Sequence, residues 1–554
     1  MTAARTYAMR LLDGRWPADI RGHHWINGPG QRLPWHQHSI FAPGVLQRLD
    51  LEPAADGELR WHVRDTHAYD VQAALAHLDV FRDPRAFHLL GGPVFTGLNN
   101  SFFLIDDRVF LTADFNRPWE IDPESMELAT VVGSVAEWGG SARLALLSPP
   151  VPTTAHPFFD RREHVLYNYS CKVLPRNGTS LSRFERPLQA AAWDGQGAVR
   201  TWDVPGAGLT QYVHEVGGTR NFVVLLESCS FQIESGIEWL DLPKLEPHLP
   251  VSNLYVIRKR DLTEENRVRG VPFRKIQVPI ESFHLLCDYD DDEVHIDFWL
   301  THGNGLDFLA ANRPGDVHWK TGKPFERWQM DRFINADYAT IGRYRADVER
   351  QTVVASHRVI DFERLWGAGV WSWDPRPANP AHSPLYVSWL GYDGALVSRR
   401  LMDLYGDRPH RILSPNSVPD AVYPPALTAV DFRSAEVAQC YVYPHGTTTL
   451  ANQFIPRPSA ESGWVGVYLV SPRRDVQYWL FDAERIAAGP IARLGHPDLR
   501  PARTIHHTWT ATAPQRTAAY HVSIADDLGD DWRHLPEPFR QVVETGLRCA
   551  ERPH

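Results

Sequence analysis

Four of the 26 histidines stand within or next to β-rich segments, close to acidic or turn residues. They are His156 in TAHPFFD, His214 in YVHEVGGTRNFVVLLE, His284 in SFHLLCDYDDDEVHIDFW and His506 in TIHHTW. The neutral imidazole nitrogen is the commonest metal ligand in proteins, and it suits Fe, Cu, Zn and Ni without choosing among them. The sequence therefore indicates a candidate metal centre, although each histidine taken alone also fits an ordinary structural role.

Other catalytic patterns are missing from the sequence. It contains no GxSxG nucleophile turn, no GxxxxGK[ST] phosphate loop and no HExxH zinc helix. The acidic run at 288–293 lacks the spaced Asp/Asn and Gly pattern of a calcium loop. The five cysteines lie far apart without a CxxC pair, which excludes a disulfide framework and a thiolate zinc site. Such cysteines suit a reducing compartment, so we expect a cytoplasmic protein.

The elements that would position the histidines are strands. Short apolar segments bounded by turn residues recur along the whole chain. In the segment 101–111, Asp106 and Asp107 separate FFLI from RVFL, which predicts a tight hairpin. Few helices are expected, and the predicted ones cover 71–80, 334–350 and the tail at 536–549. Many strands without an alternating strand and helix rhythm favour an all-β fold.

A large propeller accommodates such a chain better than a sandwich does. The sequence has 554 residues, and its 43 Pro and 38 Gly are spread without a clear domain boundary. Seven blades of four strands would use roughly 70 residues each. The first three candidate histidines are 58 and 70 residues apart, so they would lie on successive blades, each carried to the central axis by an inner strand. His506, a further 222 residues along, would come from a blade that closes the ring beside the first.

Composition excludes several classes of partner. The 57 basic and 67 acidic residues give a formal net charge of −10, and no Lys/Arg-rich run is present. A nucleic-acid partner is therefore not expected. The N-terminal segment has no apolar core of a signal peptide, and the apolar runs are far shorter than the ~18 residues that span a bilayer. We expect neither a simple secretion signal nor an integral membrane segment.

The four histidine segments resemble, in the same order, the four iron-ligand motifs of the carotenoid cleavage oxygenase family. LLDGRWPADIRGHHWINGPG, IDPESMELATVVG, GWVGVYLV and YWLFDAERIAAGPIARL also resemble parts of that family. The resemblance implies a seven-bladed β-propeller over residues 1–510, with a dome of loops and helices over its metal face. Residues 511–554 extend beyond the resemblance. We expect this extension to be partly helical and to pack on the propeller or at a contact between copies.

The resemblance also implies a cofactor and a reaction. A non-haem Fe(II) would be held by His156, His214, His284 and His506, and O2 would react beside it with a small apolar conjugated substrate. The implied reaction cleaves a C=C bond of a carotenoid, an apocarotenoid or another conjugated alkene into two carbonyl products. The segment 231–250 is a candidate apolar rim for peripheral contact with a membrane surface. Oligomeric state is left open.

Two details of the resemblance concern single positions. The fourth motif aligns His506 as the ligand, places His507 on a position that is glycine in the family, and matches Trp509 to the family tryptophan. Some stilbene-cleaving relatives carry a lysine that activates a phenol, and this chain has Ala113 at that position. The resemblance therefore disfavours a 4-hydroxystilbene substrate that is activated in that way.

The chain departs from the family at residues that support the ligands. In the family, three glutamates accept hydrogen bonds from the second, third and fourth histidines, which orients the rings. Asp114 aligns with the first glutamate, but Val397 and Ala451 align with the other two. The candidates for replacing the missing carboxylates are Asp288, Asp290 and Gln453, or backbone carbonyl groups. This divergence keeps two other hypotheses open. One is chemistry without cleavage at the same centre, such as isomerisation or hydrolysis of a polyene ester, or another oxidation, and the other is a binding scaffold without catalysis.

Overall fold

The structure, a computed structural model, describes residues 4–550 with internal gaps. The gaps are 31–42, 67–96, 115, 140–150, 152, 172–173, 176–183, 186, 210, 233–250, 304–311, 313–314, 330–335, 377–380, 382, 406–410, 459–460, 501–503, 529–532 and 534–536. The predicted helix at 71–80 and almost all of the predicted apolar rim at 231–250 lie outside the described residues.

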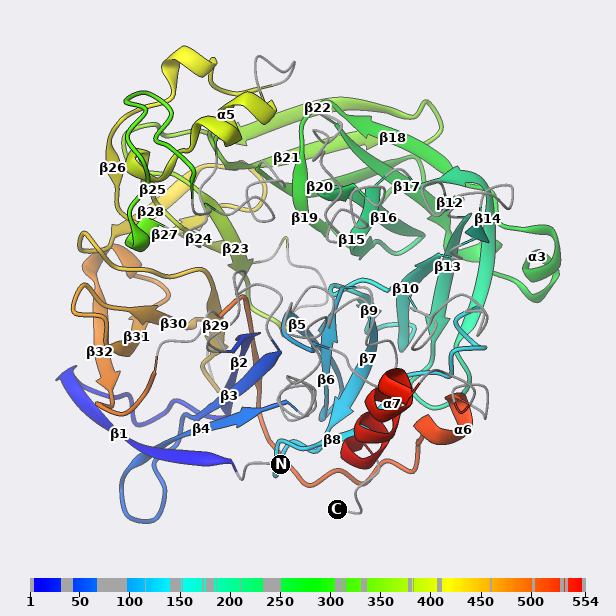
Figure 1. The fold of residues 1–554 in the computed structure, drawn as a ribbon, viewed down its shortest axis with the longest axis horizontal. Coiled ribbons are helices and arrows are strands. Elements are labelled where there is room, and N and C mark those ends of the chain that lie inside the picture. Colours follow the sequence, from blue (N-terminus) through cyan, green and yellow to red (C-terminus); the bar gives the residue numbers. More distant parts are fainter. Residues whose placement is uncertain are drawn as a thin grey trace.

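Five four-stranded antiparallel sheets surround a central axis (Figure 1). The first sheet contains β5 (Ser101–Ile105), β6 (Arg108–Ala113), β7 (Asn116–Ile121) and β8 (Leu128–Val131). The second contains β9 (Phe158–Asp160), β10 (Val165–Cys171), β13 (Pro187–Trp193) and β14 (Arg200–Gly208). The third contains β15 (Gln211–Gly218), β16 (Phe222–Gln232), β17 (Ser252–Arg258) and β18 (Arg274–Val278). The fourth contains β19 (Ser282–Cys287), β20 (His295–His302), β21 (Thr340–Asp347) and β22 (Thr352–Val359). The fifth contains β23 (Ala368–Ser372), β24 (Leu385–Trp389), β27 (Ala426–Val430) and β28 (Val437–Val442). The labels β5, β15, β19 and β23 lie towards the middle of Figure 1, as expected for inner strands of a propeller.

A nine-stranded sheet completes the ring in the order β29–β30–β31–β32–β1–β4–β3–β2–β33. Its strands are β1 (Arg5–Gly14), β2 (His23–Pro29), β3 (Gly44–Asp50), β4 (Leu59–Asp65), β29 (Asn452–Pro456), β30 (Gly463–Val470), β31 (Val476–Asp482), β32 (Pro490–Gly495) and β33 (His506–Thr510). Strand β1 joins the two halves, because residues 5–9 pair with β4 and residues 10–14 pair with β32. The propeller prediction is thus confirmed, but the structure does not divide into the seven separate blades that were predicted.

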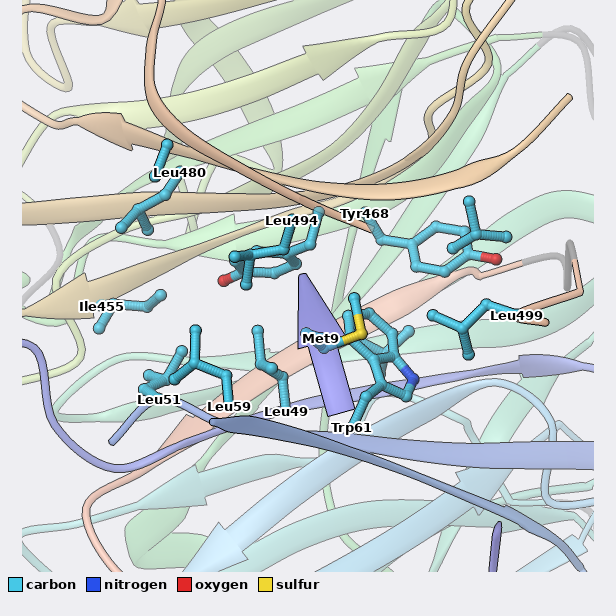
Figure 2. Close-up of a cluster of buried hydrophobic side chains, with 14 of the residues drawn as sticks. Met9, Leu49, Leu51, Leu59, Trp61, Ile455, Tyr468, Leu480, Leu494 and Leu499 are labelled. Carbon is cyan, nitrogen blue, oxygen red and sulfur yellow. The ribbon is translucent and has the colours of Figure 1, made fainter. Parts of the chain in front are cut away.

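The two halves of the nine-stranded sheet pack against each other through an apolar cluster (Figure 2). Met9, Leu49 and Trp61 come from the N-terminal half, and Tyr468 and Leu494 come from the C-terminal half. Full burial of such side chains stabilises a fold by roughly 1.5–3 kcal/mol each. Similar clusters join the other neighbouring sheets, for example β16–β18 with β19–β21.

Helices are few, which confirms the all-β prediction. The described α-helices are α3 (Glu264–Arg269), α5 (Arg399–Tyr405), α6 (Ile524–Leu528) and α7 (Glu537–Ala550). Short 3-10 helices cover Lys259–Asp261, Arg327–Gln329, Gly394–Leu396, Pro415–Ser417 and Ile486–Ala488. Two small two-stranded sheets pair β11 (Leu174–Pro175) with β12 (Phe184–Glu185) and β25 (Tyr392–Asp393) with β26 (Val422–Tyr423). None of the described helices is long and apolar enough to span a membrane. Helix α7 confirms the helix predicted at the C-terminal tail.

Two other local predictions have opposite outcomes. The hairpin is confirmed: Asp106 and Asp107 connect β5 to β6, and Asp106 adopts a positive φ of 52°, which aspartate tolerates in tight turns. The helix predicted at 334–350 is wrong, because Thr340–Asp347 forms strand β21. Strand β21 pairs with β20 on one side and β22 on the other, so tertiary pairing outweighs the local helix propensity of this segment.

The residues after β33 pack on the sheet β5–β8. The Arg117 guanidinium donates a 2.6 Å hydrogen bond to the Asp527 carboxylate, and both side chains are almost fully buried. The backbone N–H of Gly133 donates to the hydroxyl of Tyr520 at 2.7 Å. Ile524 belongs to the apolar core of this sheet. The C-terminal extension therefore forms part of the folded body in the described residues (Figure 1).

Candidate metal centre

Four separate sheets contribute the predicted histidines. His156 lies just before β9, His214 is in β15, His284 is in β19, and His506 is the first residue of β33. Strands β15 and β19 are the first strands of consecutive sheets, as the sequence spacing predicts. The inner edge of each sheet thus delivers one imidazole towards the axis.

The sheet that carries His506 has a different position in the ring from the predicted one. Strand β33 pairs with β2, so that His506 lies opposite Asn27. The sheet β5–β8 lies between β33 and β9, and β5 contacts both of these strands. The sheet of His506 is therefore not the immediate neighbour of the sheet that begins at β9.

The four imidazole rings form one cluster. The ring centroid of His156 lies 4.8 Å from those of His214 and His284 and 4.4 Å from that of His506. The ring of His284 lies 5.0 Å from that of His214 and 5.2 Å from that of His506. Ligand nitrogens of the first three histidines all lie within 4.8 Å of one another. Because a metal–nitrogen bond is about 2 Å long, small side-chain movements suffice for these nitrogens to share an ion.

Irregular strand pairing aims the ligand residues. In β15, Val213 pairs with Glu227 and Glu215 pairs with Leu226, which leaves His214 as an extra residue. In β19, the pairing skips Phe283 just before His284. An extra residue bends a strand and redirects its side chains, and such bulges are frequent next to functional sites.

Asp114 contacts the second histidine, as the sequence predicts. Its Oδ2 lies 3.2 Å from Nδ1 of His214, and the carboxylate is almost fully buried. The other oxygen, Oδ1, accepts a 3.0 Å hydrogen bond from the backbone N–H of Ala155. Asn100 donates to Oδ2 at 3.3 Å. These contacts hold the carboxylate between the first and second histidine segments.

Glu215 contacts the third histidine, and no sequence prediction named it. Its Oε2 lies 2.9 Å from Nδ1 of His284 and accepts a 2.7 Å hydrogen bond from the backbone N–H of Leu285. The one sequence feature that could have pointed to Glu215 is its position directly after the candidate ligand His214. Alternation of side chains along a strand places adjacent residues on opposite faces. The bulge at His214 interrupts this alternation and lets both residues serve one site.

The protonation tendencies of the cluster differ from residue to residue. Burial lowers the pKa of His156 well below the ordinary value of about 6.5, and the neighbouring histidines lower it further. Burial and the charges of nearby histidines do the same to the pKa of His506. Burial also acts to lower the pKa of His214, but the charge and hydrogen bond of Asp114 raise it overall. His156 and His506 are therefore neutral, which is the form that binds metals.

The donor set fits a divalent transition metal. The Nε2 atom of His156 is buried and has no hydrogen-bond partner among the described residues. A metal ion provides the missing partner for such an atom. Neutral imidazoles suit Fe(II), as they suit Cu, Zn and Ni. Asp114 and Glu215 contact the Nδ1 atoms of His214 and His284 and so leave the Nε2 atoms of these rings available to a metal.

Comparison with known proteins places this geometry in a family. The family model described as retinal pigment epithelial membrane protein matches residues 2–511. The chain belongs to this family. No match is found among curated proteins. The family match confirms the resemblance inferred from the sequence, and it ends where the C-terminal extension begins.

Solved structures show the same fold. A variant of the Synechocystis apocarotenoid oxygenase has 15% sequence identity and a TM-score of 0.60, with 92% of this chain and 97% of that chain covered. The Pseudomonas brassicacearum lignostilbene dioxygenase has 17% identity and a TM-score of 0.61, with 92% and 96% covered. Cobalt-substituted Synechocystis apocarotenoid oxygenase has 16% identity, a TM-score of 0.60 and coverages of 92% and 97%. These proteins are members of the carotenoid cleavage oxygenase family.

Val397 and Ala451, the two positions that the sequence aligns with family glutamates, are apolar and buried. Val397 lies in a cluster with Tyr338 and Trp366. Ala451 directly precedes β29 and is fully buried. Within the described part of the chain, no carboxylate contacts His506. This family member thus has carboxylate partners on two of its four histidines in the described residues.

His506 and His507 point in different directions. The ring of His506 joins the cluster, whereas the ring of His507 lies 4.9 Å from that of His24. Adjacent residues of a strand face opposite sides, which explains the separation. The alignment of His506 with the family ligand agrees with this placement.

Proposed function

We propose that the chain is a non-haem Fe(II) dioxygenase that cleaves a C=C bond of a carotenoid, an apocarotenoid or another conjugated alkene. The observation that carries the proposal is the convergence of four histidine rings at the centre of a propeller of this family. Fe(II) would be held by His156, His214, His284 and His506. When bound, it supplies the reaction of O2 with the alkene, in which each alkene carbon gains one oxygen atom.

Atom balance makes this reaction self-contained. One C=C bond and one O2 molecule become two C=O bonds, so no external reductant or organic cofactor is required. The protein has to bind the substrate, orient it and keep the ligand rings fixed. Asp114 and Glu215 serve the last task, because each accepts a hydrogen bond from the outer nitrogen of a histidine.

A partly exposed aromatic ring supports an apolar conjugated substrate. Trp371, in β23, lies with its ring centroid 6.5 Å from that of His284. Flat aromatic faces favour contact with flat conjugated molecules. Relatives are named as apocarotenoid oxygenase and lignostilbene dioxygenase, which are both enzymes for conjugated alkenes. Ala113 carries no group that could activate a phenol, so we propose a polyene in preference to a 4-hydroxystilbene.

The changed carboxylate set favours a second candidate. Val397 and Ala451 occupy the positions of two family glutamates, and such partners tune a bound metal. A centre tuned in another way suits chemistry without cleavage of a C=C bond, such as isomerisation or hydrolysis of a polyene ester, or another oxidation. An inactive propeller that binds its ligand without turnover is the remaining alternative.

Labelled oxygen separates these candidates. Purified protein is loaded with Fe(II) and incubated with a panel of carotenoids and apocarotenoids under 18O2. The proposed dioxygenase yields two carbonyl products, each carrying label from O2. A product formed without cleavage of a C=C bond supports the second candidate. Absence of any turnover across the panel, with metal bound, supports the inactive propeller.

We also propose seven blades and a cytoplasmic location. Counting each half of the nine-stranded sheet as one blade, with β33 added to the half that contains β2, gives seven. Among the described cysteines, Cys287 and Cys440 are free thiols, which suits a reducing compartment. The predicted dome over the metal face and the predicted membrane contact remain predictions.

A further inference from the structure

We infer that Glu215 is the positioning residue of the third histidine and replaces the family glutamate that aligns with Val397. This inference rests on the proposed metal-binding function and concerns how this chain builds the centre. Glu215 acts through His284 rather than on a substrate. In the family the supporting carboxylate comes from the position of Val397, far along the chain, whereas here it comes from Glu215, directly after the ligand His214.

The contacts of Glu215 fix the tautomer of the third histidine. The carboxylate can only accept hydrogen bonds, so Nδ1 of His284 must carry the proton in the 2.9 Å contact. The Nε2 atom is then left with a free lone pair for a metal. The 2.7 Å hydrogen bond from the backbone N–H of Leu285 holds the same oxygen in place. Both side chains are mostly shielded from water, with exposed fractions of 15% for Glu215 and 13% for His284.

The backbone of β15 brings this carboxylate within reach. The bulge at His214 lets two consecutive residues serve one site. Two residues later, a Cβ atom at Gly217 would lie 2.7 Å from Sγ of Cys287 and 2.9 Å from Cδ2 of Leu285. Glycine therefore permits β15 and β19 to approach closely. The motif HEVGG thus combines a ligand, its neighbour's carboxylate and the space that the approach requires.

The segment 214–216 also connects the other histidines. The backbone N–H of Val216 donates a 2.9 Å hydrogen bond to the carbonyl of His156, and the hydroxyl of Thr154 donates to the carbonyl of His214. One short segment therefore carries the second ligand, holds the third through a side chain and holds the first through the backbone. Loss of the Glu215 carboxylate is expected to weaken a metal centre that these contacts assemble together.

The alternatives named from the sequence have other contacts. The carboxylate of Asp290 accepts from the guanidinium of Arg220 at the surface. The side-chain amide of Gln453 donates to the carbonyl of Phe454 at 2.8 Å. Asp288 accepts a 3.3 Å hydrogen bond from the backbone N–H of Asp290. The Oε2 atom of Glu215, in contrast, lies 2.9 Å from Nδ1 of His284.

The test compares Fe(II) retention in wild type, Glu215→Gln and Glu227→Gln. Glu227 is the matched control, because it is a buried glutamate of the adjacent strand β16 that accepts hydrogen bonds from Asn253 and Tyr255. Each protein is loaded anaerobically and then titrated with a chelator. The inference predicts about 10 to 100-fold weaker retention for Glu215→Gln, with retention in Glu227→Gln close to wild type. The unfolding midpoint of the metal-free Glu215→Gln protein should stay close to that of wild type. If Glu215 had a general structural role, the replacement would lower this midpoint.

The outcomes separate this inference from the proposed function. A wild type that binds no metal overturns the proposed metal centre. A wild type that binds, together with Glu215→Gln that retains metal equally well, overturns the role of Glu215 and leaves the function standing. If Glu215→Gln does not fold, imidazole NMR of Zn(II)-loaded wild type decides: a proton on Nδ1 of His284 with metal on Nε2 supports the inference, and metal on Nδ1 overturns it.

Discussion

At the scale of single residues, two carboxylates support two of the histidines. Asp114 comes from the turn between β6 and β7 and meets His214, whereas Glu215 comes from the strand of His214 and meets His284. Such a partner fixes the ring orientation and increases the basicity of the ligating nitrogen. The proposed metal centre would therefore depend on acidic residues that are not themselves ligands.

Asp114→Ala is expected to weaken Fe(II) retention about 10 to 100-fold. The replacement removes the partner of His214 and also the acceptor of the Ala155 N–H. Asp290→Ala is the control, because Asp290 is an exposed aspartate paired with Arg220. Chelator titration of the loaded proteins measures the difference. Equal retention in the two variants would refute the role of Asp114.

His302 should make the protein sensitive to acid. Burial lowers the pKa of His302 to about 3, and its ring nitrogens contact Ser282 and Tyr344. Between about pH 6.5 and 3 the unfolded state binds the proton and the folded state does not, so stability is lost as pH falls through this window. From pH 7 to pH 5 the expected loss is about 2 kcal/mol. His302→Gln should lose correspondingly less over this interval.

The comparison uses metal-free protein, so that metal release does not contribute. Denaturant unfolding of wild type and His302→Gln at pH 7 and pH 5 measures the two losses. Identical pH dependence in both proteins would show that His302 does not remain neutral in the folded state.

The sequence predicted which histidines meet but not how they are held. Residue type and a family resemblance sufficed for His156, His214, His284 and His506. Glu215 was missed because regular alternation places it on the face opposite to His214. The bulge that overrides this alternation depends on the pairing of β15 with β16, which a single strand does not encode.

At the scale of elements, the close approach of β15 and β19 sets the geometry of the centre. Gly217→Ala tests it, because the added methyl group would meet Cys287 and Leu285. Overpacking of this kind costs about 1–3 kcal/mol, and the displaced strand should also weaken Fe(II) retention. Gly208→Ala is the control, because a Cβ there has no neighbour within 4 Å. Thermal unfolding and chelator titration measure both effects, and a Gly217→Ala protein like the control would contradict the argument.

The local sequence pattern predicted the hairpin of β5 and β6 correctly but not the strand β21. The hairpin of β5 and β6 follows from its own turn residues and was correct. The segment that forms β21 was predicted as a helix, although it is paired on both sides over its length. Pairing partners that lie tens of residues away decided the structure of this segment.

At the scale of the whole molecule, the chain closes its ring through both ends. Strand β33 pairs with β2, and β1 joins β4 to β32. Chain length and the family resemblance predicted seven separate blades, but β1 pairs with both β4 and β32 and so joins two four-stranded units into one nine-stranded sheet. Beyond the family match, the residues after β33 pack on the sheet β5–β8, which also carries Asp114.

Asp527→Ala should destabilise the protein by about 3–5 kcal/mol, because it leaves the buried Arg117 charge without its partner. Asp526→Ala is the matched control, since Asp526 is exposed and adjacent in the chain. Denaturant unfolding measures the difference between the two variants. Equal stability would show that the extension is not anchored through this ion pair.

The most direct test of the account is the metal content of Fe(II)-loaded protein. Wild type, His284→Ala and His295→Ala are loaded anaerobically and desalted, with His295 as a control on the adjacent strand β20. The account predicts about one iron per chain in wild type and in His295→Ala, and loss of iron in His284→Ala. No iron in wild type, or iron retained in His284→Ala, would contradict a metal centre built from the four histidines.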